Sequence, residues 1–186
     1  LIHKERDRMI DVHHTILPKT AGPTPDAAAM PDAAEILQDN LYILAPEDMV
    51  VHCAAHLIAD GDLAGGMRNL WDFHCLVQEF ADGDEGFWHR LAARSTQHQL
   101  LFDVKRAARL SYRLYNSDIP PDWRSGPITD GAFLYRLTAR DGWGRRSRKL
   151  VRLAFYIRSH WLRMPPLMLA RHLWTKWRKG HQGNAK

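Results

Sequence analysis

Three groups of side chains in this sequence belong to the residue types that enzymes use to hold metal ions or to move protons. The first is Asp11, followed closely by His13, within the apolar run 9–17. A carboxylate is the ligand that hard cations such as Mg²⁺ prefer. We therefore predict that Asp11 is a metal-binding and catalytic residue, with His13 as a second metal ligand. A solvent-facing aspartate on a strand is the alternative interpretation.

The second group is His52 and His56, and the third is Asp72. The two histidines are four residues apart, a spacing that places them on one face of a helix and that zinc sites use. The three residues between them do not include the glutamate of the zinc-protease motif. We interpret His52 and His56 as structural residues of a helical hairpin, in which Asp72 orients one of them by hydrogen bonding.

A strand would position Asp11 and His13. Along residues 9–17 apolar side chains alternate with others, so that the apolar set shares one face while Asp11 and His13 share the opposite face. Pro18 ends this strand, and residues 1–18 form the first predicted unit. Residues 19–31 are rich in Pro, Gly and Ala and are predicted to be a linker.

A helical hairpin would position the two histidines and Asp72, and the rest of the chain is organised around it. Apolar residues recur at helical spacing over residues 46–58 and again over 67–80, with a Gly- and Asp-rich break between them. Two apolar faces of this length must be buried against each other and against neighbouring helices. Asp32 would cap a short helix at about 33–38 before the hairpin.

More helices are expected after the hairpin, starting near residue 87 and covering about 100–114 and 130–140. Residues 32–144 are therefore predicted to form one helical domain. The predicted fold class is mainly α, a helical bundle with one short N-terminal strand. A chain of 186 residues with 45% apolar content can bury one sizeable core.

The C-terminal segment 145–186 differs in charge from the rest of the chain. It contains twelve Lys and Arg and no Asp or Glu, whereas the remaining residues contain 14 basic and 21 acidic side chains. An apolar, Trp-bearing stripe runs through it, so we predict a basic amphipathic helical arm. The stripe packs on the body, or the arm binds an anionic membrane surface or nucleic acid. The basic residues predicted to contact such a partner are Arg145, Arg146, Arg148, Lys149, Arg152 and Arg158.

Cysteine usage bears on the cellular compartment. Cys53 and Cys75 both fall inside predicted helices and form no disulfide framework, which suits a reducing cytoplasm. No uncharged apolar run approaches the roughly 18 residues that span a bilayer. We predict a cytoplasmic protein that associates peripherally with a membrane where its arm binds lipid.

The order of these motifs resembles the uncharacterised nucleotidyltransferase family, which is related to the polymerase-β superfold. The resemblance rests on the segments MIDVHHTILP, LAPEDMVVHCAAHL and GGMRNLWDFHCLV and covers roughly residues 5–80. The segment YIRSHWLRMPP also resembles bacterial members. The resemblance implies that this chain is the C-terminal part of such a protein. Its strand is then the remnant edge of an α+β catalytic sheet.

The resemblance also implies an activity, the metal-dependent transfer of a nucleoside monophosphate from an NTP to a hydroxyl acceptor, with Mg²⁺ as cofactor. Asp11 then corresponds to the third catalytic carboxylate. The family's Asp-x-Asp pair, expected upstream of Asp11, is not in this sequence. We expect the chain to be inactive without that half, either as a fragment or as a degenerate member. The competing class is a noncatalytic module that binds an anionic membrane or nucleic acid through its arm.

Overall fold

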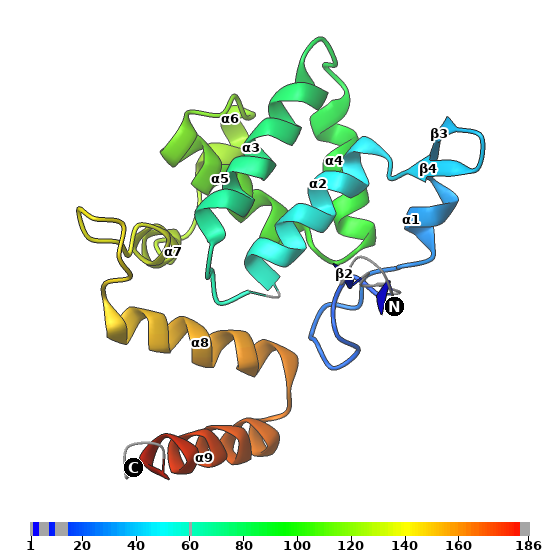
Figure 1. The fold of residues 1–186 in the computed structure, drawn as a ribbon. Helices are drawn as coiled ribbons and strands as arrows, with labels where there is room; N and C mark the ends of the chain where they lie inside the picture. Colours follow the sequence, from blue (N-terminus) through cyan, green and yellow to red (C-terminus); the bar gives the residue numbers. More distant parts are fainter. Residues whose placement is uncertain (1, 4–7, 10–14, 60, 183–186) are drawn as a thin grey trace.

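The computed structural model describes residues 2–3, 8–9, 15–59 and 61–182, and this part of the chain is mostly helical (Figure 1). This confirms the predicted mainly α class. The helices of the body are α2 (Pro46–Ala54), its π-helical continuation η1 (Ala55–Ala59), α3 (Gly66–Ala81), α4 (Phe87–Gln97), α5 (Leu101–Tyr115), α6 (Pro121–Arg124) and α7 (Asp130–Leu137). Two helices of the basic arm follow, α8 (Lys149–Arg163) and α9 (Pro166–Gln182).

The predicted hairpin forms the centre of the body. Pro46 lies in the first turn of α2, where a missing backbone N–H costs nothing. The side chains of Val50, Leu70 and Phe73 are fully buried in one continuous core that also takes in residues of α4 and α5. The hairpin prediction is therefore confirmed, and its two apolar faces are buried as expected.

The turn between the two hairpin helices depends on two glycines. Gly65 precedes α3 with φ +74°, a backbone conformation that L residues rarely adopt. A Cβ added to Gly66 would lie 2.7 Å from Cδ2 of Leu137, so the start of α3 packs closely against the end of α7. The glycine pair therefore sets how near these two elements lie.

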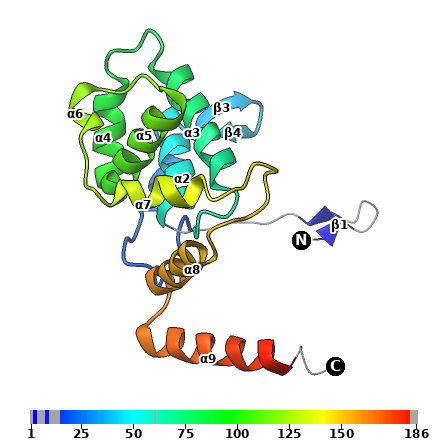
Figure 2. The ribbon, with the colours of Figure 1, turned by 90° about the vertical axis from the view of Figure 1, so that its left-hand side faces the viewer.

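The arm extends away from the body in two steps. Figures 1 and 2 both show α8 lying below the body and α9 lying farther out, at the opposite end of the molecule from α6. Phe133 of α7 and Phe155 of α8 meet edge to face with ring centroids 5.0 Å apart. Two guanidinium nitrogens of Arg158 donate to the Ile58 carbonyl, each at 3.0 Å. These contacts attach α8 to the body.

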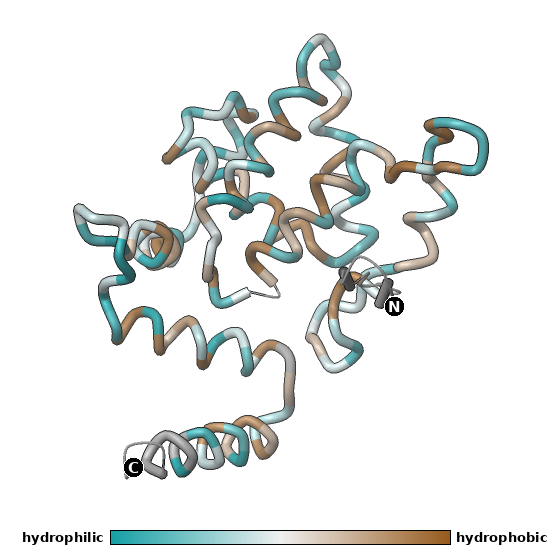
Figure 3. The backbone as a smooth tube through the Cα atoms, in the orientation of Figure 1, coloured by the Kyte–Doolittle hydropathy of each residue, from teal (hydrophilic) through white to brown (hydrophobic). Residues whose placement is uncertain are grey.

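Only part of the arm's apolar stripe packs inward. Phe155 and Leu169 are buried, whereas other large apolar side chains of the same two helices are exposed to solvent. Figure 3 shows hydrophobic and hydrophilic residues alternating along α8. The exposed apolar residues of the arm are Leu150, Leu153, Ile157, Trp161, Leu167, Met168 and Trp174.

The N-terminal strand differs from the prediction. The strand β1 (Ile2–His3) pairs antiparallel with β2 (Arg8–Met9), and residues 10–14 lie outside the described residues. Residues 15–17 are irregular, so the strand predicted over 9–17 is wrong there. Ile16 and Leu17 are buried in the helical core instead. These two consecutive side chains both pack on the helices, whereas a strand would point them to opposite faces.

The helix predicted at 33–38 is also wrong. A short helix α1 (Ala29–Asp32) ends before it, inside the stretch predicted to be a linker, and β3 (Glu35–Gln38) pairs with β4 (Leu41–Ile43) as a hairpin. Asp39 adopts φ +40° in the two-residue turn, a conformation that aspartate tolerates better than most residues. Turn chemistry therefore overrides the helical tendency of this segment.

Candidate functional site

Asp11 and His13, the predicted catalytic and metal-binding residues, lie outside the described residues. What the structure describes is the chain that follows them. Ile16 and Leu17 are 7% and 4% exposed, and both belong to the main core. The chain is therefore anchored to the helical body at residues 16 and 17.

The structure brings His52, His56 and Asp72 together around a small cavity of about 360 Å³ between α2, η1 and α3. The Nε2 atoms of His52 and His56 lie 3.2 Å apart. Their assignment as structural support stays a prediction. Within the described part of the chain, no cluster of three or more His, Cys, Asp or Glu side chains has the arrangement of a metal site.

Cys53 lines the same small cavity, and its thiol is expected to be unreactive. Its Sγ donates to the Asn69 carbonyl at 3.4 Å. Burial, with a further contribution from the Asp72 carboxylate, raises the pKa of the Cys53 thiol to about 12. A thiol with so high a pKa is not a nucleophile near neutral pH.

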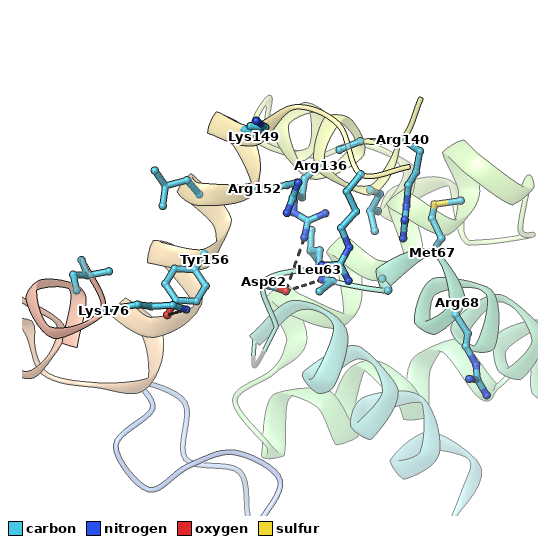
Figure 4. Close-up of a pocket in the computed structure, with 18 residues that line it drawn as sticks. Asp62, Leu63, Met67, Arg68, Arg136, Arg140, Lys149, Arg152, Tyr156 and Lys176 are labelled. Atoms are coloured by element: carbon cyan, nitrogen blue, oxygen red, sulfur yellow. Dashed lines mark hydrogen bonds and ion pairs between the residues drawn. The ribbon is translucent and has the colours of Figure 1, made fainter. Parts of the chain in front are cut away.

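A much larger cavity, of about 790 Å³, lies where the arm meets the body. One wall is the start of α3 with the residues just before it, and the other walls are the end of α7, the segment after it, α8 and α9. In Figure 4, Tyr156 and Lys176 lie on one side of it and Leu63 and Met67 on the other. A volume of this size is typical of small-molecule sites, which span roughly 300–1,000 Å³.

Positive charge dominates this lining, and we call the site the basic cavity. On the body side and in the α7–α8 segment the cationic lining residues are Arg68, Arg136, Arg140 and Arg146. On the arm helices they are Lys149, Arg152 and Lys176. Within the described residues, Asp62 is the one acidic side chain of the lining. The cavity therefore carries a large excess of positive charge.

Arg136 is the most enclosed of these cations, with 9% of its surface exposed. Its Nη2 lies 3.9 Å from Oδ1 of Asp62, and its Nε has no hydrogen-bond partner among the described residues. Burial lowers the pKa of Arg136, and the charges of Arg152, Arg146 and Arg140 lower it further, against the opposing effect of Asp62. Burial is the largest cause of the lowered pKa, and the nearby Asp62 carboxylate offsets it only in part.

The backbone adds to this field at the start of α3. Helix N-termini carry unpaired N–H groups and a partial positive charge. No side chain caps this end of α3, because the N-cap residue is Gly65. Residues 65–68 line the basic cavity, so the positive end of a 16-residue helix faces it. The N–H groups of Gly66 and Arg68 donate to the Leu63 and Gly65 carbonyls, so the helix dipole is what adds positive potential here.

The predicted partner-binding residues divide into groups in the structure. Arg146, Lys149 and Arg152 line the basic cavity. Arg158 binds the Ile58 carbonyl, and Arg148 donates to the Tyr135 carbonyl at 2.6 Å and stacks on the Tyr135 ring. Arg145 is exposed outside the lining.

Sequence reasoning missed the cavity as a site, and with it four of its cations: Arg68, Arg136, Arg140 and Lys176. Arg68 and Arg136 lie 68 residues apart in the chain, so no local motif joins them. The signals present in the sequence were the Gly65–Gly66 pair and the basic arm.

Comparison with known proteins assigns the chain to a family. The family model described as "Uncharacterised nucleotidyltransferase" matches residues 1–116, which include the predicted Asp11 strand and the whole helical hairpin. Neither a curated protein nor a solved structure gives a significant match. None of the described helices has the length and hydropathy needed to span a bilayer. Because the family model covers more than half of the sequence, the chain belongs to the uncharacterised nucleotidyltransferase family.

Proposed function

We propose that this chain is the helical C-terminal part of an enzyme that transfers a nucleoside monophosphate from an NTP to a hydroxyl acceptor. The observation that carries the proposal is the family match over residues 1–116, which contains Asp11 and the hairpin around residues 46–81. In this proposal Asp11 is the third catalytic carboxylate, and the missing partners are an upstream Asp-x-Asp pair. The chain alone is then inactive.

Asp11 and His13 would supply only one ligand of the kind that Mg²⁺ prefers. A carboxylate oxygen is a ligand that Mg²⁺ prefers, whereas the imidazole of His13 suits softer metals better. One carboxylate leaves most of a magnesium site to be supplied by other residues. When bound, Mg²⁺ would neutralise charge that develops on the transferred phosphoryl group.

The role of this chain's own residues is to hold Asp11 in place. Ile16 and Leu17 are buried in the core and follow Asp11 after a few residues. A catalytic carboxylate must be held to a fraction of an ångström to act. A helical body that buries Ile16 and Leu17 would help to meet that requirement.

Calorimetric titration with Mg²⁺ and each NTP tests the proposal. The protein is the full product of its gene, compared with an Asp11→Ala variant and with Asp118→Ala, a control whose side chain is 91% exposed. We expect Mg²⁺-dependent NTP binding that weakens at least about tenfold in Asp11→Ala and stays unchanged in the control. Absence of Mg²⁺-dependent binding, or equal binding by all three proteins, would contradict the proposal.

A second candidate function is docking of the arm on an anionic membrane surface. The observation that favours it is the exposure of large apolar residues beside the arm's basic ones: Leu167 is 86% exposed, and Trp161 and Trp174 are each 59% exposed. Basic helices with exposed Trp and Leu lie in the interface of anionic bilayers. Nucleic acid would use the same charges but would not require the apolar face.

Co-sedimentation with phosphatidylserine vesicles tests this docking. We expect binding that fades as salt rises and that weakens in Trp161→Ala, because both charge and apolar burial contribute. Trp143→Ala is the matched control, since Trp143 is 86% exposed but lies outside the arm. Binding that is lost to an RNA oligonucleotide competitor and is indifferent to Trp161 would instead indicate nucleic acid.

A further inference from the structure

We infer that the basic cavity binds a phosphate monoester group on the acceptor substrate. The identification of the ligand as the acceptor rests on the proposed function, whereas the phosphate site itself is inferred from the cavity. A monoester carries about −1.5 to −2 charge at pH 7 and three strong acceptor oxygens. That is the chemistry that a cavity lined by several cations would recognise.

Arg136 gives the first reason. It is about nine-tenths buried, lines the cavity, and has an Nε without a hydrogen-bond partner among the described residues. That Nε has almost no exposed surface, so a ligand in the cavity would contact the Nη end of the guanidinium, and phosphate oxygens are among the best partners of a guanidinium. The nearest carboxylate, Asp62, is 3.9 Å from Nη2, which is too far for a strong hydrogen bond.

The start of α3 gives the second reason. Its N-terminus has no side-chain cap and lines the same cavity as Arg136. The N–H groups of Gly66 and Arg68 already donate to the Leu63 and Gly65 carbonyls, so this helix end contributes mainly through the partial positive charge of its dipole, which favours an anion. Arg152 of α8 and Lys176 of α9 add cations from the arm helices.

The remaining lining explains why we infer an ester and not a bare phosphate. The cavity is far larger than one phosphate group, and its walls include the apolar side chains of Leu137, Leu153 and Leu173. Pockets of this kind hold an organic group against apolar walls while polar groups fix its orientation. The organic part of the acceptor would occupy that apolar portion.

The position of the cations in the chain favours the acceptor over the NTP. The family match ends at residue 116, whereas every cavity cation except Arg68 lies beyond it, between residues 136 and 176. Residues common to a family serve the reaction that its members share. A site built outside the matched residues suits the substrate in which members differ.

Isothermal titration of the full chain with phenyl phosphate, in the presence of EDTA, tests the inference. We expect saturable binding that is tighter than that of inorganic phosphate and absent for phenol. Arg136→Gln should weaken it about tenfold, because one charge-assisted hydrogen bond is lost. Arg145→Gln is the control and should change the affinity by less than about twofold, since Arg145 is exposed outside the lining.

Further variants and outcomes keep the test decisive. Arg152→Gln changes a half-buried lining residue and should weaken binding even if Arg136→Gln does not fold. Equal weakening by Arg145→Gln and Arg152→Gln would mean general charge attraction and would overturn the inference. Absence of binding at millimolar phenyl phosphate would overturn it too. Displacement of phenyl phosphate by Mg²⁺-NTP would place the nucleotide's phosphates in the cavity and overturn the acceptor assignment.

The same monoester chemistry occurs in soluble metabolites and in the headgroup of phosphatidic acid. Vesicles with and without phosphatidic acid distinguish these sources. Vesicle binding that depends on Arg136 and is blocked by phenyl phosphate would assign a lipid acceptor, and vesicle binding indifferent to Arg136 would assign a soluble one. Phenyl phosphate binding in EDTA does not need Mg²⁺ or Asp11, so its failure is distinct from failure of nucleotidyl transfer.

Discussion

Asp130 shows how single charged side chains hold the helices of this protein together. Its carboxylate is completely buried at the start of α7 and accepts hydrogen bonds from Nε of Arg106 at 2.9 Å and from Nε of Arg109 at 2.6 Å. Burial alone would raise the pKa of Asp130, but the hydrogen bonds and the charges of Arg109 and Arg106 together outweigh it and hold that pKa below its usual value. The charged form is therefore the stabilising one.

We expect Asp130→Asn to lower the free energy of unfolding by about 3 kcal/mol at pH 7, because it leaves two arginines without their buried counter-ion. An aspartate in the unfolded chain titrates near about pH 4 and this one titrates lower in the fold, so its contribution is present above about pH 4 and is lost as pH falls through the folded pKa. Urea unfolding at pH 7 and pH 3 should show the difference between wild type and variant shrinking.

The control for this prediction is Asp118→Asn, whose side chain is 91% exposed. It should change stability little at either pH, since exposed ion pairs contribute on the order of 0–1 kcal/mol. A deficit in Asp130→Asn that is as large at pH 3 as at pH 7 would mean that the ionised carboxylate is not the source of stability.

The two cysteines should differ sharply in reactivity. Cys75 is exposed, whereas burial and the Asp72 charge raise the pKa of Cys53 to about 12. Thiolate is the reactive form, so a disulfide reagent at pH 8 should modify one thiol per chain quickly and the second only after unfolding. Cys75→Ser should remove the fast reaction and Cys53→Ser should leave it. Fast modification in Cys75→Ser would contradict a raised pKa for the half-buried Cys53 thiol.

At the scale of elements, a contact between η1 and α8 attaches the arm to the body. Backbone carbonyls in the last turn of a helix lack partners within that helix. Arg158 supplies one for η1 by donating two hydrogen bonds to the Ile58 carbonyl. It also lies over the Phe133 ring, 4.9 Å from its centroid. One side chain thus links three elements.

We expect Arg158→Ala to loosen α8 without unfolding the body. Hydrogen exchange measured by mass spectrometry should speed up over residues 149–163 by about tenfold or more, because charge-assisted hydrogen bonds of roughly 1.5–3 kcal/mol are lost. The helices α3 and α5 should exchange as before. Arg171→Ala, an exposed position on α9, is the matched control. Unchanged exchange in α8 would show that Phe155 alone holds it.

At the scale of the whole molecule, an acidic helical body carries a basic arm, and the contacts between them are few. The core rests on α2 to α5, whereas the contacts of the arm with the body include those of Phe155, Arg158 and Arg148. The boundary predicted near residue 144 is therefore open to a direct test. A body that holds its own core should fold without the arm.

Truncation after residue 144 should leave a cooperative thermal transition with a lower midpoint. We expect a loss of about 3 kcal/mol or more, from the buried Phe155 contact and the hydrogen bonds of Arg158 and Arg148. Truncation after residue 164, which removes α9 and keeps Phe155 and Arg158, should lower the midpoint much less. Loss of the cooperative transition in the shorter protein would mean that body and arm form one folding unit.

The sequence by itself determined the helical hairpin, the later helices and the family. Burial of one helix face requires apolar residues at a spacing of three and four, and this pattern is legible around Val50 and Phe73 without coordinates. It did not determine the β3–β4 hairpin, whose strands are short and whose turn depends on positive φ at Asp39. Nor did alternation reveal that Ile16 and Leu17 pack on helices.

Only the tertiary structure shows that the basic cavity exists. Its cations come from segments as distant as residues 68 and 176, and their separate sequence contexts contain no common motif. Arg158 and Arg148, equally basic in the sequence, turn out to be held by the body's carbonyl groups. Helical periodicity is a property of neighbouring residues, whereas convergence of charge depends on how helices pack. The sequence therefore shows that the arm is basic, and the packing shows which charges face a common space.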